Sequence, residues 1–268
     1  MQLKVSGTGR RIVAAAGVVA VAAAGAVIAR ADDQSARTAQ TSGGLAVSPA
    51  MIERQTAVGA ANVMKVANNS SGALAVTVAA RPWTQSSSGL VSPNRRSKLA
   101  GLTVSEDSFT LAPGASKDVT VTLASAPPGG SLYGALEVIG LPTNVARRNG
   151  VIAGYRIIGS LRFNPSIRAY NLTAAAAKVA GAGSKRMLVM PIRSTGNTAE
   201  PVSGTVRVRG PLGTRQGSIK GTRILPGKRV SLPLVSAKSL PAGSYTATVT
   251  LRQGDKRFTV SKRIRVRR

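Results

Sequence analysis

The sequence predicts an all-β protein made of two tandem β-sandwich domains, and three observations support this prediction. Short runs rich in Val, Leu, Ile and Thr alternate with clusters of Gly, Pro, Asn and Ser along most of the chain. A block of turns and strands occurs twice at one spacing. Beyond the N-terminal segment, the one helix-favouring run, Ala174–Lys178, is too short to be stable alone.

The internal repeat sets the number of domains. Pro113 and Pro128 are 15 residues apart, and so are Pro226 and Pro241. In each copy a Pro-Gly pair precedes apolar residues at every second position, the pattern of a strand with one face in a core. These alternating positions are Val119, Val121 and Leu123 in the first copy, and Val230, Leu232 and Leu234 in the second. We therefore expect two immunoglobulin-like domains, 45–165 and 166–268, joined at Asn164-Pro165-Ser166, where Pro165 disfavours a continuous paired strand.

Within the first domain the same pattern predicts individual strands. They are Leu45–Val47, Ala61–Ala67, Ala73–Ala80, Leu102–Val104, Val119–Leu123, Leu132–Ile139 and Val151–Phe163.

The N-terminal segment has the features of a signal peptide. A basic start with Lys4, Arg10 and Arg11 precedes the apolar run Ile12–Ala29, and Ala29-Arg30-Ala31 fits cleavage after Ala31. Residues 32–44 are small and polar, and we expect a disordered lead-in there. If the signal is cleaved, we expect a secreted or extracytoplasmic protein associated with the cell envelope. If the apolar run is retained, it would anchor the protein in the membrane.

Positive charge is concentrated in the second half of the chain. The net charge is +28, and residues 171–268 contain 20 Lys and Arg against two Asp and Glu. Such an excess predicts docking on an anionic polymer of the cell wall or membrane surface, the alternative being a solvated face without a ligand. Nucleic acid is not expected as the partner, because aromatic residues for base stacking make up only 3% of the chain.

Alternation along the expected strands selects the candidate docking residues. Arg207 and Arg209 share one strand face, Lys256 shares a face with Phe258, and Arg263 shares one with Arg265 and Arg267. The complete candidate set is Arg207, Arg209, Lys228, Arg229, Lys256, Arg257, Lys262, Arg263, Arg265 and Arg267.

The composition argues against catalysis. The chain contains neither His nor Cys, which excludes the Ser-His-Asp triad, cysteine nucleophiles and the usual zinc and copper sites. We therefore predict no catalytic residue, no metal site and no cofactor. Two alternatives stay open: a weak calcium site at Glu106-Asp107, and a hydrolase that uses a serine–lysine pair distant in sequence.

The first domain resembles the N-terminal domain of the periplasmic pilus-assembly chaperones, the PapD-like proteins. The resemblance covers about residues 45–165. It is carried by Val47-Ser48-Pro49, by Lys65-Val66-Ala67-Asn68-Asn69-Ser70, by Val76-Thr77-Val78 in the run that ends at Trp83, by Phe109-Thr110-Leu111-Ala112-Pro113-Gly114 with the strand that follows, and by the closing stretch 155–165. The sequence is also similar to two-domain surface proteins of Gram-positive bacteria that interact with WxL proteins.

The resemblance to the chaperones implies a mechanism. Those proteins add a β-strand to an incomplete fibre subunit and hold its terminal carboxylate between an Arg of the first strand and a Lys of the last. The corresponding positions here are Glu53 and about Ile158, which makes the adjacent Arg54 and the nearby Arg156 the candidate carboxylate anchor.

Two functional hypotheses follow from these observations. In the first, the protein is a secreted, non-catalytic envelope adaptor whose basic second domain docks on an anionic polymer, while the first domain presents an edge to a protein. In the second, it is an assembly chaperone for surface-fibre subunits that acts by β-strand addition.

Overall fold

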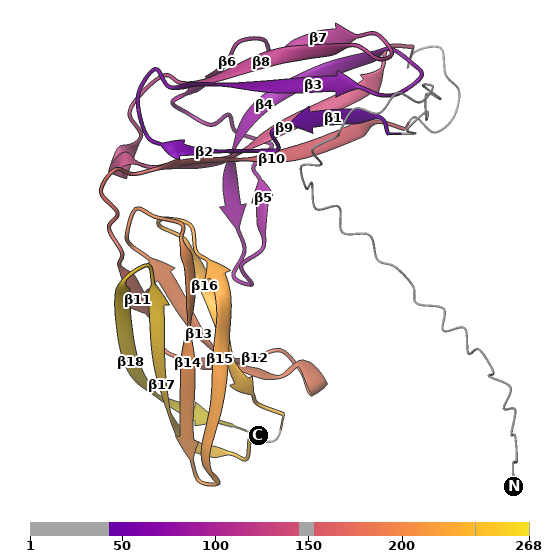
Figure 1. The fold of residues 1–268 in the computed structure, drawn as a ribbon. Helices are drawn as coiled ribbons and strands as arrows, with labels where there is room; N and C mark the ends of the chain where they lie inside the picture. Colours follow the sequence, from indigo (N-terminus) through magenta and orange to yellow (C-terminus); the bar gives the residue numbers. More distant parts are fainter. Residues whose placement is uncertain (1–42, 145–152, 239, 268) are drawn as a thin grey trace, which may run out of the picture. The chain divides into compact units, whose positions relative to one another are not determined.

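The computed structural model describes residues 43–144, 153–238 and 240–267, and these form two β-sandwiches, each with a hydrophobic core of its own (Figure 1). The all-β prediction with two tandem sandwiches is therefore confirmed. The expected signal peptide and nearly all of the expected lead-in lie outside the described residues. Within the described residues, no helix is long and apolar enough to cross a membrane.

The first sandwich consists of two sheets built from the first ten strands. One has the order β1-β3-β8-β6, and the other has the order β2-β10-β9-β4-β5, with β7 also paired to β4. The strands are β1 (Leu45–Ser48), β2 (Met51–Gln55), β3 (Ala61–Asn68), β4 (Leu74–Gln85), β5 (Val91–Pro93), β6 (Leu102–Val104), β7 (Ser108–Leu111), β8 (Ser116–Leu123), β9 (Leu132–Pro142) and β10 (Tyr155–Asn164), with a 3-10 turn at Pro128–Gly130.

The chain changes sheets between β1 and β2. Residues Leu45–Ser48 pair antiparallel with β3, whereas Met51–Gln55 pair parallel with the end of β10 in the opposite sheet. Pro49 lies between the two segments and follows a cis peptide bond. Because proline has no N–H to donate, it cannot continue a ladder, and the strand is interrupted at this point.

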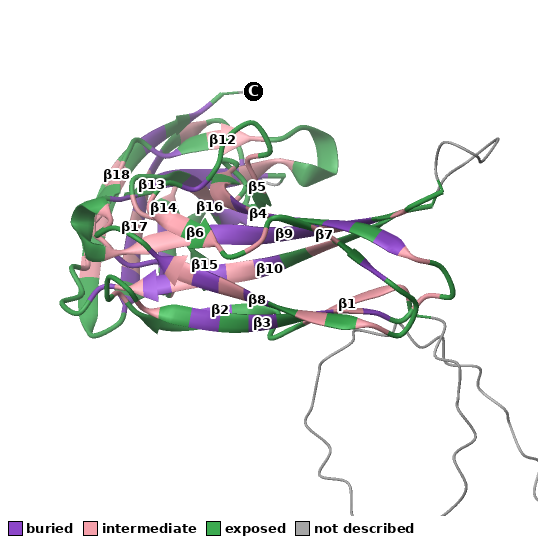
Figure 2. Cartoon of the chain, turned by 90° about the horizontal axis from the view of Figure 1, so that it is seen from above, coloured by how far each residue is buried: buried purple, intermediate pink, exposed green. Residues whose placement is uncertain are grey.

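Alternation of apolar and polar residues places the first core between these two sheets (Figure 2). In β3 the side chains of Met64 and Val66 are buried while Val63 and Lys65 are exposed, and β8 buries Val119 and Val121 in the same way. The core thus comes from the period-two positions that the sequence pattern indicates.

The second sandwich has the same layered construction. One sheet joins β11, β12 and β16 to β13, and the other has the order β15-β14-β17-β18. The strands are β11 (Leu172–Ala174), β12 (Lys178–Ala180), β13 (Met187–Ser194), β14 (Pro201–Gly210), β15 (Gly213–Arg223), β16 (Arg229–Ser236), β17 (Gly243–Gln253) and β18 (Lys256–Val266), with a 3-10 turn at Gly183–Lys185.

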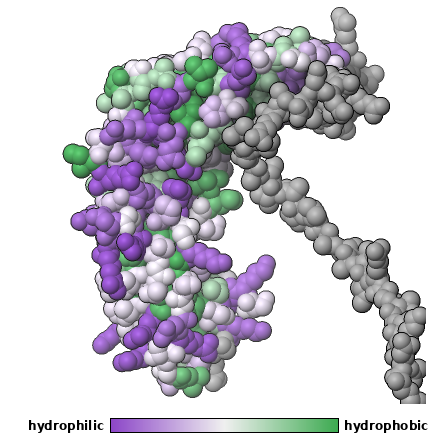
Figure 3. All heavy atoms as spheres, in the orientation of Figure 1, coloured by the Kyte–Doolittle hydropathy of each residue, from purple (hydrophilic) through white to green (hydrophobic). Residues whose placement is uncertain are grey.

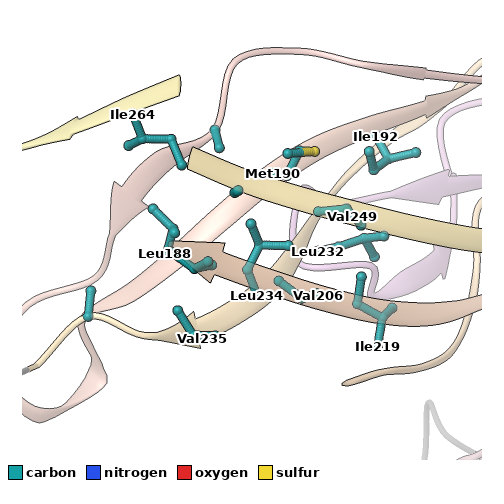
Figure 4. Packing of buried hydrophobic residues seen from close by; sticks show 14 of the residues in the cluster. Leu188, Met190, Ile192, Val206, Ile219, Leu232, Leu234, Val235, Val249 and Ile264 are labelled. Atoms are coloured by element: carbon teal, nitrogen blue, oxygen red, sulfur yellow. The ribbon is translucent and has the colours of Figure 1, made fainter. Parts of the chain in front are cut away.

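Both sheets of the second sandwich contribute aliphatic side chains to its core (Figure 4). Leu188, Met190 and Ile192 project from β13 and meet Leu232 of β16 and Val249 of β17. Since each of these is at most 1% exposed, this core is closed to solvent where they pack.

The two copies of the sequence repeat form the same turn. In the first sandwich the N–H of Gly114 donates to the carbonyl oxygen of Asn68 (2.8 Å), and in the second Gly227 donates to Ser194 (2.9 Å). Both glycines adopt a left-handed conformation, with φ of 73° and 74°, which suits glycine because it has no Cβ. Asn68 and Ser194 each end the strand that pairs with the strand after the turn, so the repeat is confirmed.

Most of the strands expected in the first domain are present, with boundaries shifted by a few residues. Of the expected strand Val151–Phe163, residues 151 and 152 lie outside the described part, and β10 begins at Tyr155. The sequence pattern did not predict β2, β5 or β7. These short strands mix polar residues or proline with apolar ones and so lack a clear period of two.

Candidate functional site

Part of β10 is an open edge of the first sandwich. Strand β9 pairs with β10 from Tyr155 to Phe163, but on the other side β2 begins to pair only at Ser160. The N–H of Ser160 donates to Ala50 on that second side (2.9 Å). By the period of two, the backbone groups of Arg156 and Ile158 point to the same side, where no described strand pairs with them. We call residues Tyr155–Gly159 the open edge; its length is about 17 Å.

Exposed apolar side chains surround the open edge. Tyr155 and Ile158 belong to it, Met51 lies opposite Ser160 where β2 begins, and Leu141 follows the residue opposite Tyr155. All four are at least 36% exposed. An unpaired row of backbone donors and acceptors beside exposed apolar side chains is what strand addition requires: the backbone supplies hydrogen bonds, and the side chains supply contacts that select the partner.

Beside the open edge, one buried carboxylate contacts three arginines. Glu137 of β9 is 1% exposed, and Arg156 Nε lies 2.7 Å from its Oε1. Arg95 Nε lies 3.3 Å from Oε1, and Arg81 Nε lies 3.3 Å from Oε2. We call these four residues the Glu137 cluster. The three guanidinium groups come from β4, β10 and the loop after β5, so the cluster joins segments distant in sequence.

The structure does not bring Arg54 and Arg156 together as a carboxylate anchor. Arg54 on β2 lies opposite Phe163, seven residues along β10 from Arg156, which corresponds to about 23 Å. Arg156 is bonded to Glu137. The two arginines cannot hold one carboxylate at that separation, so the expected anchor is not formed by this pair.

Glu53, the residue aligned with the chaperone arginine, is itself paired. Asn164 Nδ2 donates to its Oε1 (3.0 Å), and Arg162 Nη1 lies 3.1 Å from its Oε2. The hydrogen bond from Asn164, followed by the hydrogen bond and charge of Arg162, holds the pKa of Glu53 below its ordinary value of 4.5, against the opposing effect of partial burial. Glu53 therefore remains ionised at neutral pH.

The ten basic candidates of the second domain separate into groups on different surfaces. Arg207 and Arg209 on β14 and Arg257, Arg263 and Arg265 on β18 occupy outward positions of one sheet. Three others do not join them, because Lys228 and Arg229 precede or begin β16 in the opposite sheet, and Lys262 shares the inward side of β18 with Ile264. Lys256 lies an even number of residues from Lys262 on β18 and so belongs to the same, inward side. Arg267 follows the end of β18.

Sequence reasoning missed residues that lie between these arginines. Thr246, Thr248 and Thr250 of β17 stand on the same outward face, and Gln216 lies opposite Arg207 on β15. The alternation of Thr with Ala and Val in residues 246–250 was the available signal, since it marks a strand with a hydroxyl-bearing face.

At the alternative calcium site, Glu106-Asp107, the structure places a basic side chain next to Glu106. Glu106 forms an ion pair with Lys117, whose amino group also lies 5.1 Å from the centre of the Phe109 ring. Among the described residues, no group of three or more His, Cys, Asp and Glu side chains is placed to hold a metal ion.

Comparison with known proteins identifies the type of fold. No family model matches the sequence, and no curated protein matches it. Among solved structures, the crystal structure of the class 5 fimbriae chaperone CfaA is 14% identical, with a TM-score of 0.50, and the match covers 82% of this chain and 99% of that one. A chain from a chaperone–tip adhesin complex of CFA/I fimbriae biogenesis is 12% identical, with a TM-score of 0.52 and the same coverage. The chain therefore has the PapD-like fold, as the sequence resemblance predicted.

Proposed function

We propose that this protein is a non-catalytic, extracytoplasmic binding protein whose first sandwich captures an extended segment of a partner protein by β-strand addition. One observation carries the proposal: five consecutive residues of β10, Tyr155–Gly159, pair with no described strand on one side. The exposed side chains of Met51, Leu141, Tyr155 and Ile158 next to this edge supply apolar contacts. The signal-like N-terminal sequence supports an extracytoplasmic location, where a surface protein or fibre subunit is the partner we propose.

Site-specific crosslinking tests strand capture directly. A photoreactive amino acid is placed at position 158 in the full chain, in the cells that produce the protein, and the crosslinked partner segment is identified by mass spectrometry. The same amino acid at position 65 is the control, because Lys65 is also exposed but lies where β3 pairs with β1 on one side and with β8 on the other. Capture predicts one defined segment at 158 and none at 65.

A peptide of the crosslinked sequence then separates strand addition from simple contact. Binding should slow hydrogen exchange of the Arg156 and Ile158 amides, because they acquire hydrogen-bond acceptors. Ile158→Pro removes one of these donors without removing a bond to β9, so it should weaken binding about tenfold or more. Binding without amide protection, or unaffected by Ile158→Pro, would reject strand addition.

Polyanion docking by the second sandwich is a second candidate function, and a specific observation favours it. Residues 171–268 contain 20 Lys and Arg but only two acidic side chains, Glu200 and Asp255. Binding of residues 32–268 to isolated cell envelopes across a salt series distinguishes the two functions. Docking on a polyanion weakens steeply as salt rises, whereas strand capture with apolar anchors resists salt.

A further inference from the structure

One face of the second sandwich carries arginines and hydroxyl groups but no carboxylate. This is the outward face of the sheet β15-β14-β17-β18, which we call the Arg/Thr face. Apart from Pro201 and Arg223, which pair where β14 begins and β15 ends, the outward side chains along these strands are Arg, Lys, Thr, Ser or Gln. Its members are Ser203, Thr205, Arg207, Arg209, Thr214, Gln216, Ser218, Lys220, Ser244, Thr246, Thr248, Thr250, Arg252, Arg257, Thr259, Ser261, Arg263 and Arg265.

Strand register arranges these side chains in rows across the sheet. One row runs through Arg209, Thr246 and Arg263, which lie directly opposite one another on β14, β17 and β18. The next row, two residues along β14, places Arg207 beside Thr248. Strand geometry separates Arg207 from Arg209 by about 7 Å and Arg209 from Arg263 by about 10 Å. The face therefore carries rows of cationic side chains with hydroxyl groups between them.

No carboxylate of the described residues forms an ion pair with the arginines of this face. Among the described residues, Arg207, Arg209, Arg257, Arg263 and Arg265 form no ion pair and no side-chain hydrogen bond. In contrast, the arginines around Glu137 in the first sandwich share a carboxylate. Five guanidinium groups thus keep their donors available to an external anion, and a planar guanidinium can bind one carboxylate, sulfate or phosphate with two hydrogen bonds.

The middle of the Arg/Thr face is hollowed and polar. A shallow hollow of about 610 Å³ is lined by Arg207, Arg209 and Gln216 together with the three threonines of β17. The corresponding region is mostly white and purple in Figure 3, where β14 and β17 lie in Figure 1. Thr248 and Ser261 lie 3.2 Å apart, so hydroxyl groups of neighbouring strands also contact each other.

These features select one class of partner. The outward positions include no large apolar side chain that could enter a bilayer and no aromatic ring for stacking on bases. Hydroxyl and amide groups between the cations match a ligand that is itself rich in hydroxyl groups. We propose that the Arg/Thr face binds an acidic polysaccharide, with its anionic groups on the arginines and its sugar hydroxyls on Thr, Ser and Gln. This inference rests on the polyanion docking proposed above and names its site and ligand class.

The test uses the purified full chain and four defined probes. These are dextran sulfate, polygalacturonate, inorganic polyphosphate, and vesicles that contain phosphatidylglycerol. Arg207→Ser/Arg209→Ser/Arg263→Ser removes three cations from the face. Arg193→Ser/Lys228→Ser/Arg229→Ser is the matched control, because it removes the same charge from β13 and the segment at the start of β16 in the opposite sheet. Thr246→Val/Thr248→Val removes hydroxyl groups and keeps the side-chain shape.

The proposal predicts a pattern across these variants. The face variant should bind both polysaccharides about tenfold more weakly or worse, and the control should lose about threefold or less. The Thr→Val pair should weaken polysaccharide binding while binding to polyphosphate stays unchanged. Each variant must first show the wild-type unfolding temperature, so that a loss of binding is assigned to the surface.

Other outcomes overturn different parts of the argument. Equal losses in the face and control variants would reject the Arg/Thr face as the site and leave docking by net charge. Polyphosphate preference with unaffected Thr→Val variants would reject the polysaccharide, and preference for vesicles would indicate a membrane surface instead. Failure to bind any probe at low salt would reject polyanion docking itself.

Discussion

Arg156 Nε donates a 2.7 Å hydrogen bond to Oε1 of Glu137, and this carboxylate is 1% exposed. Arg156 belongs to the open edge of β10, and Glu137 belongs to β9, the next strand toward the centre of the sheet. The hydrogen bond therefore joins the open edge to the neighbouring strand. Two further arginines, Arg81 and Arg95, share the same carboxylate. The cluster thus holds β4, β9, β10 and the loop after β5 together.

Glu137→Gln should destabilise the first sandwich by about 1–3 kcal/mol. The substitution leaves three guanidinium groups close together without a counter-charge, and their partial exposure lowers the cost below that of a fully buried pair. Urea unfolding followed by fluorescence of Trp83, the single tryptophan of the chain, measures this change. Glu53→Gln, at an exposed ion pair, is the control and should cost about 1 kcal/mol or less. Equal effects would contradict the assigned role of the cluster.

Asn68 should be more important for stability than its neighbour Asn69. The buried Asn68 amide donates to the carbonyl oxygens of Leu111 (3.0 Å) and Gly72 (2.8 Å), and its Oδ1 accepts from the N–H of Ser70 (3.0 Å). Asn68→Ala removes these three hydrogen bonds, one of them to the buried carbonyl oxygen of Leu111, and should cost about 2–3 kcal/mol. The exposed Asn69→Ala should change the urea midpoint little. A small loss for Asn68→Ala would show that water replaces its hydrogen bonds.

Gly114→Ala should cost about 1–2 kcal/mol through the backbone alone. A Cβ at Gly114 would meet no atom within 4 Å, so its φ of 73° is the source of the cost. Gly72→Ala is the matched control in the same sandwich, because its Cβ also meets nothing and its φ is not in the left-handed region. Trp83 fluorescence in urea compares the two, and similar midpoints would exclude backbone strain as the reason for glycine at this turn.

Acidification should remove a contribution of Glu53 to stability. Because its pKa is lower in the folded state than the ordinary value of 4.5, the contribution is present above that value and is lost as the pH falls through the folded pKa. The urea midpoints of wild type and Glu53→Gln should therefore differ at neutral pH and converge as the pH falls below the folded pKa of Glu53. A difference that persists unchanged at low pH would assign it to packing.

The sequence predicted the local features better than the pairing between distant segments. The Pro113-Gly114 and Pro226-Gly227 turns and the alternating strands after them were predictable, because backbone conformation and period-two burial are encoded within a few residues. The burial of Glu137 was not predictable, since its arginines come from three other segments.

In the candidate sites, too, local features were predictable from the sequence and the pairing of distant segments was not. Alternation placed Arg207 with Arg209 correctly, but separation of Lys228 from these arginines depends on which sheet each strand joins. The open edge depends on where β2 begins to pair with β10, at Ser160. Sheet membership and register are decided by contacts far apart in the chain, and a single sequence shows them only through repeats.

The beginning of β2 also limits how firmly the open edge can hold a partner. A strand that adds to Tyr155–Gly159 runs toward Met51, where β2 already occupies the same side of β10. Only about five partner residues fit, and Arg156 and Ile158 together offer four backbone groups. At about 1 kcal/mol for each hydrogen bond, and with the entropy cost of association opposing binding, the backbone alone gives no better than millimolar affinity. For the proposed strand capture we therefore expect a short-lived complex, in which the exposed apolar side chains decide the residence time.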